Sequence, residues 1–313
     1  MNNGSRIVAL GHYQPARVLT NHELAQTVDT SDEWIRSRVG IETRRIAAPN
    51  ETEADMATAA ADKALASSGL TAADIDMVAV ATCSASDRCP NVASRVAGAL
   101  GIKAPAAYDV NTACSGFSYA LATVDHAIRA GAGHNAIVIG AEKLSDITDW
   151  TDRSTCVIFG DGAGAAVVTA SEEPGIGPVL WGSDPEKQDA VVIEGWHPHI
   201  WQAGQTVFRW ATFALPKLAE EACARAGVKP EELAAFIPHQ ANLRIIEPLG
   251  RKLGAHGAVL ATDVVESGNT SAASIPLALS KLVERREIPS GAPVLLFGFG
   301  GGLTYAGQVV RCP

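Results

Sequence analysis

The chain has 313 residues, 47% of them hydrophobic and 19% charged, and its formal net charge is −9. This length and composition suit a well-packed protein with two domains, or one domain built twice, and the acidic balance argues against a general nucleic-acid binder. No apolar run reaches the roughly 18 residues of a membrane-spanning helix, and no signal-peptide pattern opens the chain. We therefore expect a cytoplasmic protein that works without nucleic acid or a membrane.

The six cysteines lack the CxxC spacing of zinc and redox sites, so we expect neither a metal nor a disulfide. Basic residues gather around 36–45 and 244–252. They form either a solvated face or a docking site for an acidic or phosphate-bearing partner, and composition alone does not choose between the two.

In the first half of the chain, apolar strands alternate with helices. Residues 6–11 are predicted to form the first strand, and short helices are expected near 20–23 and 29–34. Further strands are expected at 76–82, 106–110, 134–140 and 159–168, and further helices at 53–68, 91–100 and 113–130. This alternation predicts an α/β fold of βαβ units, with a largely parallel sheet covered on both faces.

The second half repeats this order. A helix is expected at 214–226, strands at 233–237, 258–262, 293–297 and 304–310, and another helix from Asn269. Gly227 follows Gly69 by 158 positions, and Asn269 follows Asn111 by the same 158. A constant offset indicates a duplicated unit, with an N-terminal half at 1–172 and a C-terminal half at 173–313. Residues 182–204 fit neither half; their two histidines, His197 and His199, are a weak metal signal, and we expect a surface loop.

Cys114 lies where the strand at 106–110 gives way to the helix at 113–130. Free backbone N–H groups and the positive end of the helix dipole gather at such a position, so we expect the thiol to lose its proton more easily than a free one. A buried structural cysteine is the ordinary alternative when a cysteine is taken alone.

Three polar or glycine-rich stretches of the second half follow strands. We expect them to face the boundary between the two halves, where Cys114 also lies. His239 follows the strand that ends at Ile237, and Asn269 lies in a strand-to-helix turn, where helix capping is the simpler interpretation. The glycines at 300–302 allow backbone N–H groups to approach a developing oxyanion, although they could also form a simple turn. A cysteine facing a histidine and an asparagine indicates a nucleophile with its partners.

Five motifs resemble those of the β-ketoacyl-[acyl carrier protein] synthase III family. They lie at residues 112–117, 159–164, 238–242, 268–274 and 299–302, and the resemblance extends from about Arg6 to Val310. It implies a thiolase-like fold of duplicated βαβ halves in five α-β-α-β-α layers, and a homodimer.

The resemblance also implies a mechanism that needs no metal or other cofactor. Cys114 would take an acyl group from acyl-CoA, and His239 and Asn269 would hold the thioester carbonyl of malonyl-acyl carrier protein while it loses CO2. The N–H groups of Cys114 and Gly301 would form the oxyanion hole. The product would be a 3-oxoacyl-acyl carrier protein, which initiates fatty acid synthesis.

Binding residues carry over by the same resemblance. The expected coenzyme A contacts are Trp34 and Arg153 beside the adenine, and Arg38, Phe208, Ala241 and Asn242 along the pantetheine. The expected docking patch for the acidic carrier protein is Arg209, Arg244, Arg251 and Lys252.

Three departures from the family pattern concern the tunnel that, by the resemblance, holds coenzyme A. Cys89 stands where many members carry Phe, in a loop that would reach the acyl pocket of the partner subunit. This smaller side chain predicts primers larger than acetyl. Gln205 stands where Asn is common, and the segment 182–204, expected to roof the tunnel, is shorter than usual.

Several alternatives stay open. The same chemistry could prime a polyketide or another secondary pathway, or the fold could transfer an acyl group without condensation. A Cys-His-Asn hydrolase and a non-catalytic scaffold are the remaining classes, and the duplicated layout and the intact set of three residues argue against them.

Overall fold

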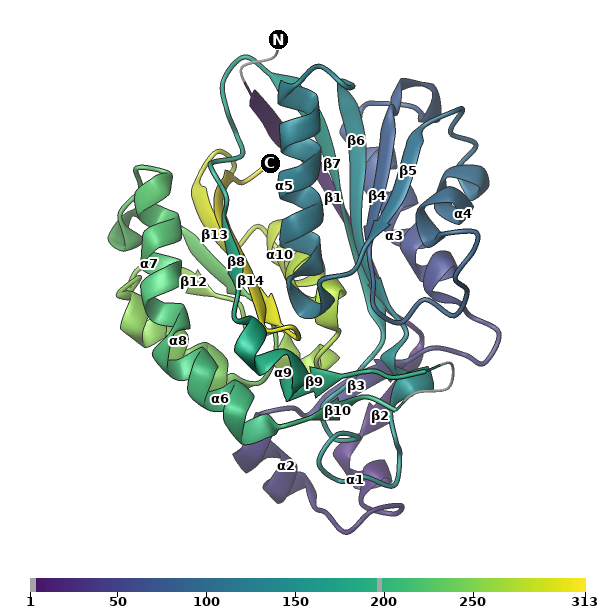
Figure 1. The fold of residues 1–313 in the computed structure, drawn as a ribbon, viewed down its shortest axis with the longest axis vertical. Coiled ribbons are helices and arrows are strands. Elements are labelled where there is room, and N and C mark those ends of the chain that lie inside the picture. Colours follow the sequence, from purple (N-terminus) through teal and green to yellow (C-terminus); the bar gives the residue numbers. More distant parts are fainter. Residues whose placement is uncertain (1–3, 196–198) are drawn as a thin grey trace.

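The computed structural model describes residues 4–195 and 199–313 and contains two five-stranded sheets (Figure 1). The first sheet has the order β1-β7-β6-β4-β5, from β1 (Gly4–Tyr13), β4 (Met77–Ala81), β5 (Ala106–Val110), β6 (Asn135–Glu142) and β7 (Gly162–Ser171). The second has the matching order β8-β14-β13-β11-β12, from β8 (Leu180–Ser183), β11 (Ala235–Pro238), β12 (Val259–Leu260), β13 (Pro293–Gly300) and β14 (Thr304–Arg311).

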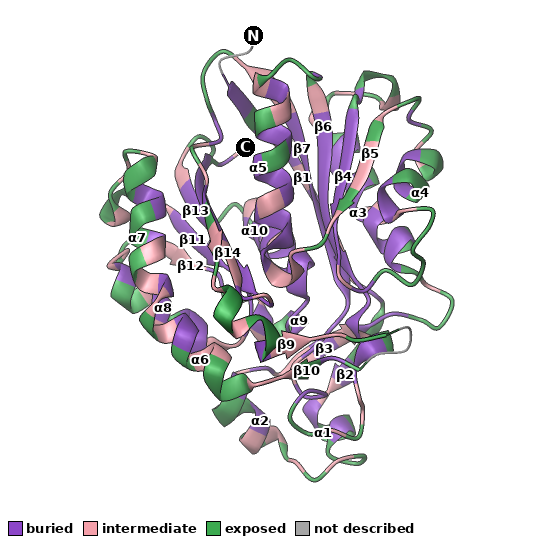
Figure 2. Ribbon diagram, in the orientation of Figure 1, coloured by how far each residue is buried: buried purple, intermediate pink, exposed green. Residues whose placement is uncertain are grey.

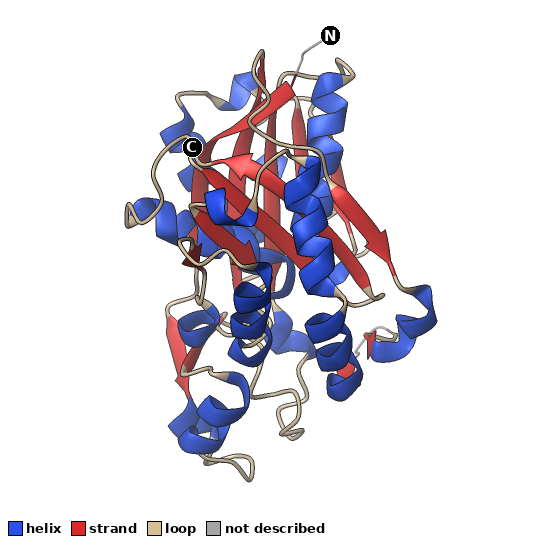
Figure 3. Cartoon of the chain, turned by 90° about the vertical axis from the view of Figure 1, so that its left-hand side faces the viewer, coloured by secondary structure: helices blue, strands red, loops and turns tan. Residues whose placement is uncertain are grey.

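The two sheets alternate with three layers of helices, as the resemblance implies (Figures 1 and 3). The central layer contains α5 (Gly116–Arg129) and α10 (Ser274–Glu284). One outer layer contains α3 (Glu53–Ser68) and α4 (Val92–Ala99), and the other contains α7 (Leu215–Arg225) and α8 (Leu243–Leu253). The predicted duplication is confirmed, because the starts of β4 and β11, of β6 and β13, and of α5 and α10 each lie 158 positions apart.

The expectation of largely parallel sheets is wrong. β4 pairs in parallel with β5 and β6, and β11 pairs in parallel with β12 and β13, but the remaining neighbours in both sheets are antiparallel. Parallel neighbours need a long crossover, usually a helix. β13 and β14 are joined by a short turn instead, so the chain reverses direction there. β7 also returns antiparallel to β6, after a longer link that contains the helical turn Leu144–Ile147.

Local sequence sets the ends of the predicted helices. Thr52 and Asp55 form a reciprocal capping box at the start of α3, and Gly69, with φ of 77°, ends it. Thr20 caps α1 (Asn21–Leu24) in the same way, and the Ser31 side chain caps α2 (Asp32–Val39). The expected helix at 53–68 therefore has the observed bounds.

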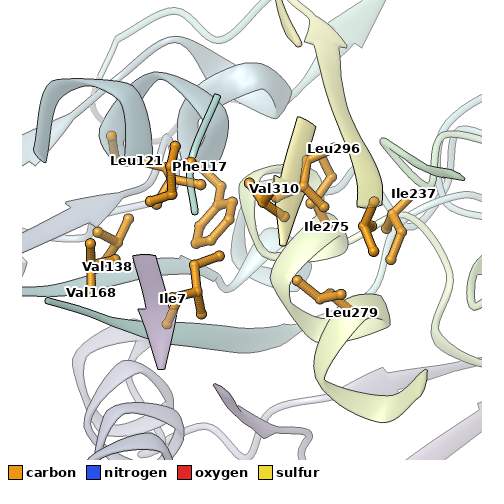
Figure 4. Close-up of a cluster of buried hydrophobic side chains, with 14 of the residues drawn as sticks. Ile7, Phe117, Leu121, Val138, Val168, Ile237, Ile275, Leu279, Leu296 and Val310 are labelled. Carbon is orange, nitrogen blue, oxygen red and sulfur yellow. The ribbon is translucent and has the colours of Figure 1, made fainter. Parts of the chain in front are cut away.

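Apolar side chains from both halves meet in one core between the sheets (Figure 4). The first half contributes Ile7, Phe117, Leu121, Val138 and Val168, and the second contributes Ile237, Ile275, Leu279, Leu296 and Val310. Much of α5 is buried along its length (Figure 2). Because the halves share this core, the starts of α5 and α10 are held against each other at the midline.

Shorter elements cover one end of the sheets, at the bottom of Figure 1. They include β2 (Arg17–Thr20), β3 (Thr43–Ile46), α6 (Gly204–Phe213) and α9 (Val264–Ser267), together with α1 and α2. Arg44 of β3 does not belong to a solvated or docking face. It is fully buried, its guanidinium donates to Asn21 Oδ1 and Val157 O at 2.7 Å, and burial lowers its pKa to about 10.

The segment 182–204 is more than a surface loop. It contains a helical turn (Pro185–Ala190) and the short antiparallel pair β9 (Val191–Val192) and β10 (Trp201–Gln202). His197, which we considered as a metal ligand, lies outside the described residues, and His199 lies 3.8 Å from a carboxylate oxygen of Asp149. Within the described part of the chain, no helix is both long and apolar enough to cross a bilayer.

Candidate active site

Cys114 lies in the helical turn Ala113–Ser115, which joins β5 to α5. It lines a cavity of about 620 Å³ that His239, Asn269 and Gly301 also line. The structure therefore brings together the nucleophile and the two partners that the sequence analysis placed in opposite halves.

His239 follows β11 and is almost completely buried. Its Nδ1 lies 2.7 Å from Ser274 Oγ, and the edge of its ring packs on Phe299 with the centroids 5.2 Å apart. Ser274 Oγ also accepts the Gln240 N–H at 3.3 Å, which favours the tautomer in which Ser274 donates to Nδ1 and Nε2 carries the ring proton. Burial lowers the pKa of His239 to about 3, so its imidazole is neutral and can donate from Nε2.

Asn269 is held by backbone contacts on both sides. Its N–H donates to Ile158 O at 2.9 Å, and its carbonyl accepts the Gly160 N–H at 3.1 Å. Its side-chain oxygen Oδ1 accepts the N–H of Ser271 at 2.8 Å, a local turn of the Asx type. Thr270, not Asn269, occupies the N-cap position of the helical turn Ser271–Ala273, so Asn269 is not a helix cap. The amide Nδ2 is then the donor that Asn269 can offer to a ligand in the cavity.

The glycine at the end of β13 packs directly on Cys114. A Cβ at Gly300 would lie 2.6 Å from the Cβ of Cys114 and 2.9 Å from its sulfur, closer than real side chains approach. Gly301, the next residue, lines the cavity. Glycine is therefore required at 300 because the backbone must pass within contact of the thiol.

The expected easy ionisation of Cys114 is wrong for this structure. Burial raises the pKa of its thiol to about 11, with a further rise from the nearby Glu142 carboxylate. Hydrogen bonds from the Ser271 side chain and the Gly301 backbone lower it, but not enough to offset burial. The start of α5 does not by itself make Cys114 a thiolate.

The cavity extends outward from the three residues to the surface. Four of the six expected coenzyme A contacts line it, namely Arg38, Phe208, Ala241 and Asn242. The other two lie together at the protein surface, where the Arg153 guanidinium lies 5.0 Å from the ring centroid of Trp34. Gln205 also lines the cavity, as do Val191, Ile200 and Gln202 from the segment 182–204.

The four expected docking residues are all exposed, but they differ in their contacts. Arg209 and Arg244 line the cavity, and the Arg244 guanidinium lies 5.6 Å from the Phe208 ring centroid. Arg251 lies 3.7 Å from Glu247, and the Lys252 ammonium donates to Thr212 O at 2.8 Å.

Cys89 is exposed and is not among the residues that line this cavity. Part of its loop, Cys83 to Ser86, lines a second cavity of about 660 Å³, which shares Val191 and Gly301 with the first. The loop of one chain therefore borders a space next to Cys114 rather than the cavity itself.

Sequence reasoning missed three buried polar residues around the site: Glu142, Ser271 and Ser274. Ser271 and Ser274 were noted only as part of a motif. Glu142 ends the apolar run at 136–141, and a charged residue at the end of a buried strand is the signal that could have drawn attention to it.

Comparisons with known proteins identify the family. Residues 108–185 match the family model described as 3-oxoacyl-[acyl-carrier-protein (ACP)] synthase III, and residues 223–312 match the model of its C-terminal domain. A protein of Streptomyces coelicolor named β-ketoacyl-[acyl-carrier-protein] synthase III 4 is 66% identical, over the full length of both chains. The chain belongs to the β-ketoacyl-[acyl carrier protein] synthase III family.

Further proteins are similar to this chain in sequence and in fold. A Streptomyces avermitilis relative is 67% identical over 99% of this chain and 100% of its own. The crystal structure of the priming β-ketosynthase from the R1128 polyketide biosynthetic pathway superposes with a TM-score of 0.98 at 40% identity, covering 100% of this chain and 97% of that one. The Aquifex aeolicus synthase III gives 0.94 at 42% identity, covering 98% and 100%.

Proposed function

We propose that this synthase III loads an acyl group from acyl-CoA onto Cys114 and condenses it with malonyl-acyl carrier protein, giving a 3-oxoacyl-acyl carrier protein that initiates fatty acid synthesis. The single observation that carries the proposal is the cavity that Cys114, His239 and Asn269 line together. Family membership supplies the reaction class.

The arrangement suits two successive half-reactions. In the first, the Cys114 sulfur attacks the thioester carbonyl of acyl-CoA, and the N–H groups of Cys114 and Gly301 stabilise the oxyanion. In the second, His239 Nε2 and Asn269 Nδ2 donate to the thioester carbonyl of the malonyl group as CO2 leaves. Both donors are neutral, so they stabilise the enolate without a cation to quench the carbanion, which then attacks the acyl-cysteine.

The electron pair for the new carbon–carbon bond comes from the bond to CO2, so the proposed reaction uses two substrates and no cofactor. Arg38, Phe208, Ala241 and Asn242 would hold the pantetheine, with Trp34 and Arg153 at the adenine. Arg209, Arg244, Arg251 and Lys252 would dock the acidic carrier protein. All six cysteines are free, which suits the reducing cytoplasm that we propose as its compartment.

We also propose that the enzyme is a homodimer of duplicated subunits, each with halves at 1–172 and 173–313. β5 is an edge strand, paired only with β4 among the described strands of its sheet. Its neighbour in the fold is the loop that carries Cys89, because Asn91 Nδ2 donates to Ala107 O at 3.1 Å. In the proposed dimer a second copy lies against this edge, and by the family resemblance its Cys89 loop reaches the acyl pocket.

The test is intact-protein mass spectrometry after mixing with acetyl-, isobutyryl- and octanoyl-CoA, with Cys114→Ala as the control. The expected result is one acyl adduct that Cys114→Ala lacks, followed by CO2 release and product on adding malonyl-carrier protein. Acylation without condensation would show an acyltransferase, and no adduct with any acyl-CoA would refute the proposal.

The similarity to the R1128 priming ketosynthase favours one second candidate, a priming enzyme of a secondary pathway. The chemistry would be the same, but the carrier protein would differ. Comparing kcat/KM with a fatty-acid and a polyketide malonyl-carrier protein of the same organism separates the two.

A further inference from the structure

Ser274 is a buried serine at the first position of α10, and its hydroxyl contacts the imidazole of His239. The Ser274 Oγ lies 2.7 Å from His239 Nδ1. His239 directly follows β11 and lines the cavity, whereas Ser274 is not among the residues that line it. The contact therefore ties the imidazole of the site to a helix of the central layer, from behind the cavity wall.

The backbone next to His239 decides which way this hydrogen bond runs. The Gln240 N–H donates to Ser274 Oγ at 3.3 Å, so the hydroxyl already accepts one hydrogen bond. Among the described residues, no carbonyl accepts from the Ser274 hydroxyl. If His239 carried its proton on Nδ1, the buried hydroxyl proton would be left without an acceptor, which costs free energy. The favourable arrangement is therefore donation from Ser274 to Nδ1.

The main chain beside His239 is fixed by the buried side chain of Gln240. Its Nε2 donates to Pro238 O at 2.8 Å and to Ala261 O at 3.1 Å. Its Oε1 accepts the Val264 N–H at 3.1 Å. A buried polar side chain with its donors and its acceptor satisfied holds its surroundings rigidly. The imidazole is thus attached to a fixed backbone, and its tautomer depends on what Nδ1 contacts.

We propose that Ser274 is a positioning residue for the condensation step, which it serves by donating to Nδ1 of His239 and so keeping the proton of the neutral imidazole on Nε2. This inference rests on the proposed function, in which Nε2 donates to the malonyl thioester. Ser274 acts through His239 and does not touch the substrate. Without its hydroxyl, the proton can move to Nδ1, and Nε2 then offers a lone pair in place of a donor.

A second serine–histidine contact on α10 provides a matched control. Ser280 Oγ lies 2.8 Å from His12 Nδ1, and Ser280 is buried, as Ser274 is. Neither His12 nor Ser280 is among the residues that line the cavity of Cys114. Ser280→Ala therefore removes the same kind of contact from the same helix and leaves the site untouched.

The first test reads the tautomer directly, by nitrogen-15 NMR of the histidine rings in the intact protein near pH 7.5. The His239 signals are those that His239→Asn lacks. In the wild type, Nε2 should be the protonated ring nitrogen and Nδ1 the unprotonated one. Ser274→Ala should show the proton shared between the two nitrogens, and Ser280→Ala should leave both signals unchanged. A wild-type His239 protonated on Nδ1 would overturn the proposal without any variant.

The second test separates the half-reactions. Ser274→Ala should lower kcat for CO2 release from malonyl-carrier protein about 10- to 100-fold, because the donor to the developing enolate is present in only part of the molecules. KM for malonyl-carrier protein and the rate of Cys114 acylation by acyl-CoA should stay within a few-fold of wild type. An equal loss in both half-reactions, or the same loss in Ser280→Ala, would show a general structural effect and contradict the positioning role.

The two tests also keep this inference apart from the proposed function. The expected tautomer and its change in Ser274→Ala, without acylation of Cys114 or CO2 release by the wild type, would refute the condensing function and keep the contact between Ser274 and His239 as the device that sets the tautomer. Normal condensation by the wild type, with an unchanged tautomer and full rate in Ser274→Ala, would do the reverse.

Discussion

Gly300 and Cys114 are in such close contact that a methyl group on residue 300 would stand 2.9 Å from the sulfur. The two residues come from opposite halves of the chain, at the end of β13 and the start of α5. The position of the Cys114 thiol is therefore set by the packing of one half against the other.

Gly300→Ala is expected to displace the thiol and reduce Cys114 acylation at least tenfold, because the added carbon overlaps Cys114 Cβ and Sγ. Intact mass spectrometry at short reaction times measures this. Gly98→Ala is the control, since no atom lies within 4 Å of an added Cβ there; it should keep full activity and stabilise α4 by about 0.5–1 kcal/mol. Equal losses in the two variants would contradict the contact argument.

His239→Ala and Asn269→Ala should separate the half-reactions. Each removes one donor to the malonyl thioester, so decarboxylation should fall about 100- to 1000-fold, while acylation of Cys114 stays within a few-fold of wild type. CO2 release and intact mass measure the two steps independently. Loss of acylation in both variants would mean that these residues activate the cysteine instead.

The depressed pKa of His239, about 3, links stability to pH. In the unfolded chain this histidine binds a proton near its ordinary pKa of about 6.5, but in the folded protein it stays neutral. The unfolded state therefore gains protons as the pH falls below 6.5, and the free energy of unfolding should decrease progressively towards pH 3. Urea denaturation at pH 7.5, 6 and 5 measures this loss, which should be smaller in His239→Asn.

Charge reversal at Arg244 should weaken binding of the carrier protein. Arg244 lies at the mouth of the cavity, so Arg244→Glu should raise KM for malonyl-carrier protein about tenfold or more and leave acylation by acyl-CoA less affected. The defect should shrink at high salt. Lys103→Glu, an exposed lysine that lines neither cavity, is the matched control, and an equal rise in its KM would show a general charge effect.

Cys89→Phe should narrow the choice of primer. In the proposed homodimer, a phenyl ring in place of the thiol fills volume in the acyl pocket of the partner subunit, so octanoyl-CoA should lose rate far more than acetyl-CoA. Acylation rates with the acyl-CoA series measure the change. An unchanged octanoyl-to-acetyl ratio would show that residue 89 lies away from the acyl chain.

Local sequence was enough to determine the helix ends and the repeat. Thr52, Asp55 and Gly69 specify α3 because caps and a left-handed glycine act over a few residues. The 158-residue offset and the residue types at 114, 239 and 269 could likewise be read directly, because duplication and motif spacing are written along the chain.

Only the tertiary structure decided the rest, because strand direction and proton affinity depend on neighbours that are distant in sequence. The reversals of the chain between β6 and β7 and between β13 and β14 make both sheets mixed. Burial, supplied by both halves together, raises the pKa of Cys114 against the effect expected at a helix start. The same packing brings Glu142 of the first half against the second half, where the Ala272 N–H donates to it at 3.4 Å, a contact that no local pattern predicts.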